Sequence, residues 1–329
     1  MRWIVRKTVF SIVTLFVAIT VTFFLYRVIP GNPVDLMLNY YLSLGYSYEE
    51  ALSRVLMMVP FIPTAPLHEQ YIDFLRGILS GDFGYSFTLA QPITRILGYA
   101  IPWTVFSLSI SLVISFMLGT VIGMYIAYKR GSLIDRIMSF YASVTTAMPQ
   151  NILGFFLIWS LAIQLRLFPK ELGPYGPTVD PSKFNLEFIL SVLRHAALPI
   201  LTYVLTTIGS WVLMMKSSTI SVLGEYYVTA AEARGLKDRR IITTYVGRNA
   251  VLPLFTRFAI ALGFMFGGAL LIENLFLYPG IGRYLTIGIQ MRDYPLVTAG
   301  FLITSVATVL GNLFAELLYS RLDPRIKFE

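Results

Sequence analysis

The sequence predicts an all-α membrane protein with six transmembrane helices. Hydrophobic residues make up 56% of its 329 residues and charged residues only 13%, whereas soluble proteins carry about 25% charged residues. Six stretches are also long and apolar enough to cross a bilayer, which takes about 20 mostly apolar residues. They lie at 8–26, 102–128, 137–164, 197–215, 258–277 and 296–319.

The first stretch follows Arg2, Arg6 and Lys7, a pattern that also fits a secretory signal peptide. However, its uncharged run is longer than the roughly 7–15 residues of a signal-peptide core, and no A-x-A cleavage site follows it. We therefore expect an uncleaved transmembrane helix over residues 1–28.

Small residues and a proline mark the later stretches. The third contains Pro149, where the span can bend. Gly119 and Gly123 in the second stretch, and Gly263 and Gly267 in the fifth, form G-x-x-x-G pairs. Because glycines one helical turn apart let another helix approach closely, we expect tight helix packing at both pairs.

The distribution of basic residues predicts the orientation. Lys and Arg resist translocation, so the segments that hold most of them are expected in the cytoplasm. Most of the 26 Lys and Arg residues fall in four segments, whereas the remaining loops carry as many acids as bases. This places both termini in the cytoplasm, in agreement with an even number of spans. The four cytoplasmic segments are 1–7, 129–136, 216–257 and 321–329.

A long external segment separates the first two spans. Ser47-x-x-Glu50 reads as a capping box at the start of a helix, and apolar residues recur at helical spacing from Tyr71 to Ile78, ahead of Gly81. Two interpretations stay open: an amphipathic cap that lies on the membrane, or a contact surface for a soluble partner. The pattern assigns no role to residues 42–66.

The residues needed for several chemistries are absent from the sequence. It has no cysteine and only two histidines, His68 and His195, which excludes disulfides, thiol nucleophiles and a His/Cys zinc site. It contains neither a GxxxxGK[ST] phosphate loop nor HExxH. Its net charge of +8 is typical of positive-inside loops. We therefore expect no catalytic site, no metal site and no nucleic-acid partner.

The cytoplasmic segment between the fourth and fifth spans predicts a helix–turn–helix. Gly235, which adopts positive φ without a Cβ clash, suits the sharp turn. Small residues before the turn would let another backbone approach, and the basic residues around it could pair with carboxylates of a partner. The alternative is a solvated positive-inside loop. The expected face of the first helix is Tyr226, Tyr227, Ala230, Ala231 and Arg234.

This loop and five other strings resemble the dipeptide/oligopeptide/nickel branch of the permeases of binding-protein-dependent ABC importers. The stretch TAAEARGLKDRRIITTYVGRNAVLP is similar to the EAA-type loop of those permeases. The five other strings occur along the chain in the same order as the family's landmarks. They are PGNPVDLM, GDFGYSF, LYPGIGRYL, RDYPLV and LDPRI. The resemblance covers nearly the whole chain, from Pro30 to Ile326.

The resemblance implies an ABC type I importer permease fold in three parts: an N-terminal helix (1–28), an external cap segment (29–101) and a five-helix core (102–329) that includes a coupling loop (216–255). It also implies a second homologous permease, two ATPase subunits that bind ATP and Mg, and an extracytoplasmic substrate-binding protein. All would work at the cytoplasmic membrane of a prokaryote. The chain itself would hold no cofactor and would be no enzyme.

In that family the first short helix of the loop rests in a groove on the ATPase, so closure of the ATPase dimer on ATP moves the spans. Thr229 stands where other importer permeases have the name-giving glutamate, as is common in the peptide branch. The resemblance implies that ten residues of this loop couple the permease to the ATPase. They are Tyr227, Thr229, Ala230, Ala231, Glu232, Arg234, Gly235, Leu236, Arg239 and Pro253.

Glu273 is the one candidate for the substrate path. A charged side chain at the centre of a membrane helix costs about 2.5–3.5 kcal/mol and usually faces the bundle interior or a cavity. Glu273 lies near the outer end of the fifth predicted span. Either it contacts the substrate or gates the path, or it makes a structural hydrogen bond to neighbouring backbone.

Three functions stay open at this point. The first is ATP-driven uptake of di- or oligopeptides, and the second is uptake of oligosaccharides by the same machinery. The third is an autonomous secondary transporter. That class commonly places several ionisable residues at mid-bilayer and often shows internal repeats, whereas this sequence has two acids near span ends and no repeat. We therefore expect the peptide importer.

Overall fold

The computed structural model describes residues 2–28, 33–58, 66–264 and 270–322. Its elements are helices except for one short antiparallel pair, β1 (Tyr85–Ser86) and β2 (Gln91–Pro92), within those ranges. The chain forms two compact units. Unit 1 comprises Met1–Thr104, Phe266–Asn274 and Pro279–Leu310; unit 2 comprises Val105–Met265, Leu275–Tyr278 and Gly311–Glu329. The division into 1–28, 29–101 and 102–329 therefore stays a prediction.

In unit 1, the first helix packs on a helix of the segment that follows it. In α1 (Arg2–Val28), Phe23 is buried against Tyr71 and Phe74 of α4 (Leu67–Ser80). The Thr20 hydroxyl also lies 2.6 Å from the Tyr71 hydroxyl. The helix predicted from the apolar residues between Tyr71 and Ile78 is therefore present. It ends just before Gly81, whose left-handed φ of 75° terminates α4.

Two shorter helices, α2 (Pro33–Ser43) and α3 (Tyr48–Met58), form their own small core. The capping box is confirmed, because the Ser47 N–H donates to Glu50 Oε2 at 3.1 Å and the Glu50 N–H donates to Ser47 Oγ at 3.3 Å. Part of the unassigned segment 42–66 lies outside the described residues. The core of the pair consists of Met37, Tyr41, Ala51 and Val55.

In unit 2, the part of α5 (Ile93–Tyr128) that begins at Val105 packs with α6 (Leu133–Ala147) against α8 (Leu186–Leu223). The expected close contact at Gly119 and Gly123 is confirmed: a Cβ at Gly119 would overlap Trp211, and one at Gly123 would lie 2.5 Å from the Val212 carbonyl oxygen. Gly263 and Gly267 fall outside the part whose packing is described.

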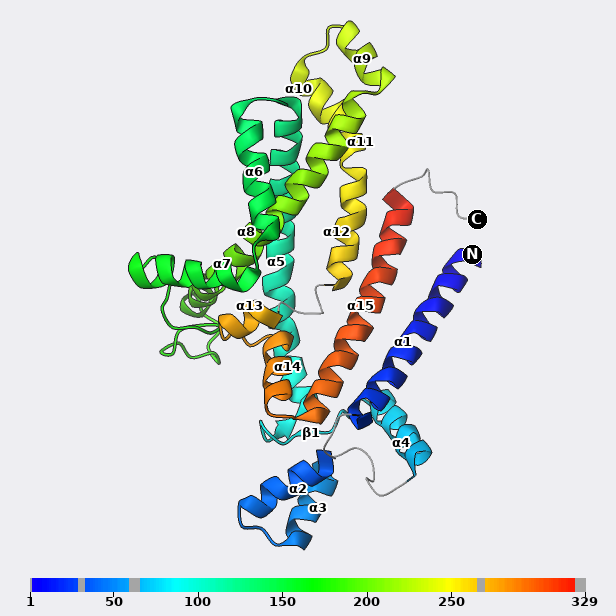
Figure 1. Cartoon of the computed structure of the whole chain (residues 1–329), viewed down its shortest axis with the longest axis vertical. Helices are drawn as coiled ribbons and strands as arrows, with labels where there is room; N and C mark the ends of the chain where they lie inside the picture. Colours follow the sequence, from blue (N-terminus) through cyan, green and yellow to red (C-terminus); the bar gives the residue numbers. More distant parts are fainter. Residues whose placement is uncertain (1, 29–32, 59–65, 265–269, 323–329) are drawn as a thin grey trace. The chain divides into compact units, whose positions relative to one another are not determined.

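The bend expected at Pro149 is confirmed. The helix pair 133–147 and 150–164 turns by 106° at Met148 and Pro149. Met148 is extended, with φ −80° and ψ 127°, because the residue before a proline is sterically kept out of the helical region. Pro149 then starts α7 (Gln150–Leu157), which continues as the π-helical turn η1 (Ile158–Gln164) (Figure 1).

A largely buried ion pair ties α6 to α8. The Lys216 ammonium lies 2.5 Å from Asp135 Oδ1 and donates to the Ser139 hydroxyl at 2.9 Å. Asp135 also accepts from the Gly131 N–H at 3.0 Å. The carboxylate is thus bonded on both oxygens, as a buried charge requires. The pair fixes the end of α8 from which the predicted coupling loop continues.

Four described helices are long and apolar enough to cross a membrane, and the bent α6–η1 segment makes a fifth candidate. The first, second, fourth and sixth predicted spans fall in α1, α5, α8 and α15 (Tyr294–Leu322), and the third is the bent segment. The fifth, 258–277, is divided between α12 (Leu252–Phe264) and α13 (Leu270–Leu275), with 265–269 outside the described residues.

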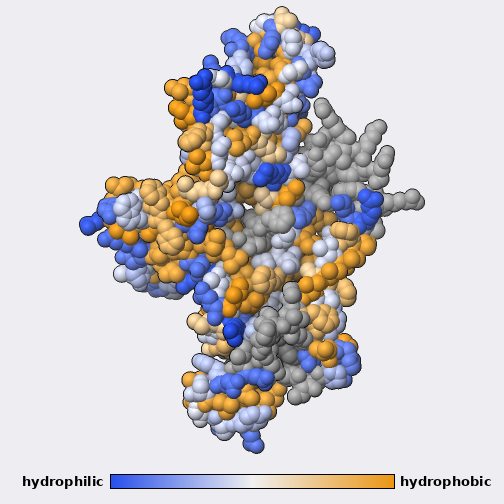
Figure 2. Space-filling view, viewed as in Figure 1, coloured by the Kyte–Doolittle hydropathy of each residue, from blue (hydrophilic) through white to orange (hydrophobic). Residues whose placement is uncertain are grey.

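The surface of these helices is apolar. Figure 2 shows hydrophobic residues on the visible face of both units, and only 6% of the apolar window of α1 is buried inside the protein. Side chains such as Phe10, Met117 and Phe155 are more than half exposed. Exposed apolar area on this scale marks an interaction surface, and together with the helix lengths it identifies a multi-pass membrane protein.

The close contact at Gly123 gives a stability prediction. Gly123→Ala places a methyl group 2.5 Å from the Val212 oxygen and 2.7 Å from Met215 Cβ, so we expect the free energy of unfolding to fall by about 1–3 kcal/mol. Gly98→Ala, on the same helix with nothing within 4 Å, is the matched control and is expected to raise it by about 0.5–1 kcal/mol. Thermal unfolding of the two purified variants tests this; an equal effect would contradict the packing.

Candidate coupling loop and buried helix caps

The predicted helix–turn–helix is present and continues directly from α8. After Gly224 the chain forms α9 (Tyr226–Ala233), turns, and resumes as α10 (Asp238–Arg240), the π-helical η2 (Ile241–Gly247) and α11 (Arg248–Ala250), which leads into α12. Figure 1 shows α9 and α10 beyond the end of α8, close to α11. The segment is therefore folded and is not a merely solvated loop.

Gly235 makes the turn as expected. Its φ is +69°, a left-handed conformation that L-residues with a Cβ rarely adopt. Its N–H donates to the Glu232 carbonyl at 2.8 Å, and the Leu236 N–H donates to the Ala231 carbonyl at 3.3 Å. These two bonds form a Schellman motif, which satisfies the last carbonyls of α9.

The loop has its own hydrophobic core. Val228 and Ala231 of α9 are buried against Ile241 and Val246 of η2, and Leu236 packs on them from the turn. Val222 and Leu223 at the end of α8 join the same cluster. One hydrophobic core therefore holds α9, η2 and the end of α8 together.

A hydrogen bond adds to this core. The Asn249 side-chain N–H donates to the Tyr227 hydroxyl at 3.0 Å and to the Tyr245 carbonyl at 2.9 Å. One amide of α11 thus holds α9 to η2. Sequence reasoning missed Asn249 and the inward role of Val228, although the Val228/Ala231 spacing of three residues was a readable signal for a buried face.

The predicted face of α9 needs correction. Ala231 points into the loop core, whereas Tyr226 is 93% exposed and Ala230 is also exposed. Ala230 and Ala231 are consecutive, so on a helix they are rotated by about 100° and do not share a face. Ala231 is therefore not available to a partner backbone, and the accessible small residues are Ala230 and Ala233.

The remaining residues predicted for coupling lie mostly on the outside of this folded unit. Leu236 is half-buried in the turn. The exposed ones lie on α9, in the turn, on α10 and at the start of α12. They are Tyr227, Thr229, Ala230, Glu232, Arg234, Gly235, Arg239 and Pro253.

Glu273 lies elsewhere, in unit 1, and its carboxylate is bonded to protein. It is 2% exposed. The Thr104 hydroxyl donates to Glu273 Oε1 at 2.7 Å, and the Gly282 N–H donates to Oε2 at 2.6 Å. The Thr104 hydroxyl in turn accepts from the Ile281 N–H at 2.9 Å. Glu273 thereby serves the N-terminus of α14 (Ile281–Gln290), where a carboxylate is favoured by the unpaired N–H groups and the helix dipole.

The glycines of the PGIG string explain how the backbone reaches this carboxylate. A Cβ at Gly280 would overlap the Glu273 carboxylate, and one at Gly282 would lie 2.7 Å from Leu270 Cα. Only glycine fits at both positions. Of the two interpretations of Glu273, the geometry favours the structural hydrogen bond over the substrate path.

A second buried carboxylate repeats the arrangement at the start of α15. Asp293 is fully buried and accepts from the Ser86 hydroxyl at 2.5 Å and from the Thr88 N–H at 3.1 Å. Its other oxygen accepts from the Leu296 N–H at 3.3 Å, inside α15. The GDFGYSF and RDYPLV strings, far apart in sequence, thus meet at this carboxylate.

The chain combines apolar helices of membrane length with a folded helix–turn–helix that continues from one of them. This combination defines a membrane protein that presents a structured surface outside its spans. Residues 119–328 match the family described as "binding-protein-dependent transport system inner membrane component". The chain belongs to this family, whose fold is that of the type I ABC importer permeases.

Relatives with assigned roles match over essentially the whole chain. The oligopeptide transport system permease protein AppB of Bacillus subtilis is 28% identical over 99% of this chain and 99% of its own length. The di/tripeptide transport system permease protein DppB of Pseudomonas aeruginosa is 30% identical over 100% and 99%. The dipeptide transport system permease protein DppB of Escherichia coli is 30% identical over 99% and 99%.

Proposed function

We propose that this chain is one of two permease subunits of an ATP-driven importer that takes up di- or oligopeptides delivered by a binding protein. The observation that carries the proposal is the folded, exposed helix–turn–helix within 216–255, in a chain that belongs to the family of binding-protein-dependent transporters. The similar permeases named above serve oligopeptides, di/tripeptides and dipeptides, which favours peptides over oligosaccharides. Membership of this family also disfavours an autonomous secondary transporter.

The proposed mechanism follows from how the loop is built. When two ATPase subunits close on ATP and Mg, they would displace α9 through its exposed residues, Thr229 and Ala230 among them. The core around Val228 and the Asn249–Tyr227 hydrogen bond make α9 and η2 move together. The movement would then pass into α8 and α12, which alternates access between the two sides.

The remaining features of the proposal concern topology and partners. Both termini would lie in the cytoplasm of a prokaryotic cell, with the loop 216–255 on the same side as the ATPases. A homologous permease would complete the path, and an extracytoplasmic binding protein would deliver the cargo. ATP and Mg would be bound by the ATPase subunits and not by this chain, which would act as a transport subunit without an ATPase site.

Purification in a gentle detergent from the native membrane, followed by mass spectrometry of the bound proteins, tests the proposal. We expect an ATPase and a second permease to remain bound. Reconstituted into liposomes with the binding protein, the complex should take up a labelled dipeptide in an ATP-dependent manner and should not take up a labelled oligosaccharide. Recovery of the chain alone, with uptake that needs no ATP, would contradict the proposal.

A further inference from the structure

The turn that joins α5 to α6, in unit 2, concentrates basic side chains. Lys129 and Arg130 lie in the turn and Arg136 lies in the first turn of α6, and all three are exposed. Within the described part of the chain, none of these three side chains makes an ion pair or a hydrogen bond. The turn therefore presents three positive charges that the protein itself does not neutralise.

The one acid of this turn faces the protein interior. Asp135 is buried, is paired with Lys216 of α8 and accepts from the Gly131 N–H. Its negative charge is thus used inside the protein. Asp238 of the coupling loop hydrogen-bonds to Tyr128 at the end of α5 and has basic residues on both sides in the sequence. The surface around the turn therefore stays positive.

Next to these cations, α6 exposes a column of apolar side chains. Its members recur at helical spacing, four, three and four residues apart, so they lie on one face of the helix. All but the last are more than half exposed. Arg136 is three residues from the first member and four from the third, which places its side chain beside the column. The members are Leu133, Ile137, Phe140 and Val144.

The column is as long as one leaflet of a bilayer is deep. From Leu133 to Val144 the helix rises about 16 Å, and one leaflet holds half of a hydrocarbon core that is about 30 Å thick. Because α6 belongs to one of the candidate membrane spans, the column runs from the bilayer surface into the acyl chains. A negative headgroup above an apolar chain of this length is the chemistry of an anionic phospholipid.

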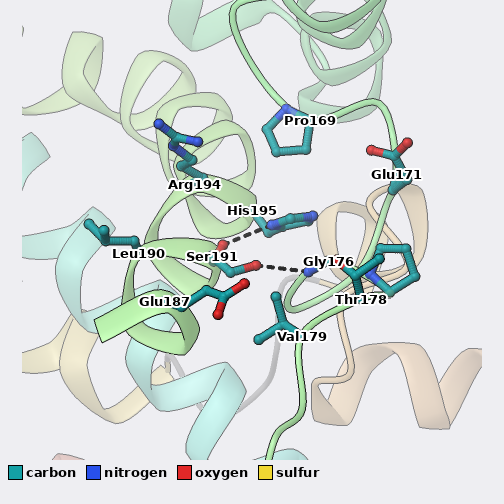
Figure 3. Close-up of a pocket in the computed structure, with 11 residues that line it drawn as sticks. Pro169, Glu171, Gly176, Thr178, Val179, Glu187, Leu190, Ser191, Arg194 and His195 are labelled. Carbon is teal, nitrogen blue, oxygen red and sulfur yellow. Dashed lines mark hydrogen bonds between the residues drawn. The ribbon is translucent and has the colours of Figure 1, made fainter. Parts of the chain in front are cut away.

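The uniform charge distinguishes this turn from the pocket of about 530 Å³ at the start of α8. That pocket is lined by Glu171, Glu187 and Arg194, which mix both signs and do not converge in Figure 3. The three cations of the α5–α6 turn have one sign and adjoin an apolar face. They therefore select an anion that carries a hydrocarbon chain.

We propose that the α5–α6 turn binds an anionic phospholipid, with the headgroup phosphate on Lys129, Arg130 and Arg136 and one acyl chain along the apolar column of α6. Lys and Arg near a bilayer surface attract anionic headgroups, and both form charge-assisted hydrogen bonds to phosphate. Ser132 caps α6 by accepting from the Asp135 N–H at 3.3 Å, so the turn is formed without the lipid. Binding requires neither ATP nor a partner protein and does not depend on what the chain transports.

Native mass spectrometry of the full-length chain in detergent tests the proposal. The chain is titrated with dioleoyl phosphatidylglycerol or with dioleoyl phosphatidylcholine, which have the same acyl chains but differ in net charge. We expect the Kd for phosphatidylglycerol to be about tenfold lower. An excess of glycerol 3-phosphate, which has the phosphate without the acyl chains, should not displace the lipid.

Two results with the unaltered chain would overturn the proposal. Equal affinity for the two lipids would do so, and would leave an acidic protein surface, such as that of an ATPase subunit, as the partner of these cations. Displacement by glycerol 3-phosphate would also do so, because it would identify a site for a free phosphate compound. Neither comparison depends on the folding of a variant.

A triple variant locates the binding. Lys129→Gln, Arg130→Gln and Arg136→Gln, combined in one chain, are expected to abolish the tenfold preference, so that phosphatidylglycerol binds as phosphatidylcholine does. The substitutions remove only the charges and leave the apolar column in place. A preference that survives in this variant would place the lipid elsewhere and overturn the assignment.

The matched control removes three exposed cations of the same types from the coupling loop. Lys237→Gln, Arg240→Gln and Arg248→Gln cause the same change in net charge, but no large apolar side chain is exposed in the described segment 236–248. This variant should keep the tenfold preference for phosphatidylglycerol. Equal loss of the preference in both triple variants would show a general effect of net charge and would overturn a site at the turn.

Discussion

Replacing Gly235 by proline is expected to reduce ATP-driven peptide uptake to background, while the assembled complex still hydrolyses ATP. Gly235 has a φ of +69°, and the proline ring fixes φ near −65°. Proline also lacks the N–H that donates to the Glu232 carbonyl. The turn would open, so α9 would no longer move as one body with η2 and α8. Uptake and ATP hydrolysis measured side by side in proteoliposomes check this.

A matched variant separates the conformation of the turn from the identity of the residue. Asparagine tolerates the left-handed region better than other L-residues and keeps the backbone N–H. Gly235→Asn should therefore retain most of the uptake. Uptake at the unaltered level in Gly235→Pro would show that the turn does not transmit the movement.

Glu273→Ala is expected to destabilise the chain by on the order of 3 kcal/mol. The substitution deprives the Thr104 hydroxyl and the Gly282 N–H of their acceptor, and each buried donor left without a partner costs about 1–3 kcal/mol. Glu273→Gln keeps one acceptor oxygen and should lose roughly half as much. Thermal unfolding in detergent, with the exposed Glu69 replaced by alanine as a control, measures the difference.

The same variant distinguishes the two interpretations of Glu273. If the carboxylate mainly caps α14, Glu273→Ala lowers stability and reduces uptake only in proportion to the folded chain that remains. If it mainly contacts substrate, the variant folds as stably as the unaltered chain and uptake falls. The second outcome would restore the substrate path as its role.

Much of this architecture was readable from local chemistry. The capping box at Ser47, the bend at Pro149 and the positive φ of Gly235 were all predicted, because each depends on the backbone preferences of one or two residues. The contact at Gly119 and Gly123 was predicted for a similar reason, since small residues at one-turn spacing permit close helix packing.

What the sequence did not show depends on contacts between distant residues. The side of α9 that Ala231 faces is decided by Ile241 and Val246, and spacing within one helix does not reveal it. Likewise, the pairing of Glu273 with Thr104 joins residues 169 positions apart, and that of Asp293 with Ser86 joins residues 207 apart. An acid within an apolar span, such as Glu273, is visible in the sequence, but its hydrogen-bond partners are fixed only by the fold.

The same separation explains how the LYPGIGRYL string acts. Gly280 and Gly282 give no sign of binding a carboxylate by themselves, yet the backbone at both positions closes around Glu273. The fifth predicted span was harder to read, because apolar composition alone does not show where α12 ends and α13 begins.

The most direct test of the coupling role uses the absence of cysteine from the chain. A single cysteine introduced by Ala230→Cys, on the exposed side of α9, can carry a photo-crosslinker in native membranes. We expect a covalent product with an ATPase subunit. Leu79→Cys, at a position 88% exposed on α4, should give none. No ATPase product at Ala230→Cys, or the same product from both sites, would contradict the coupling role of the loop.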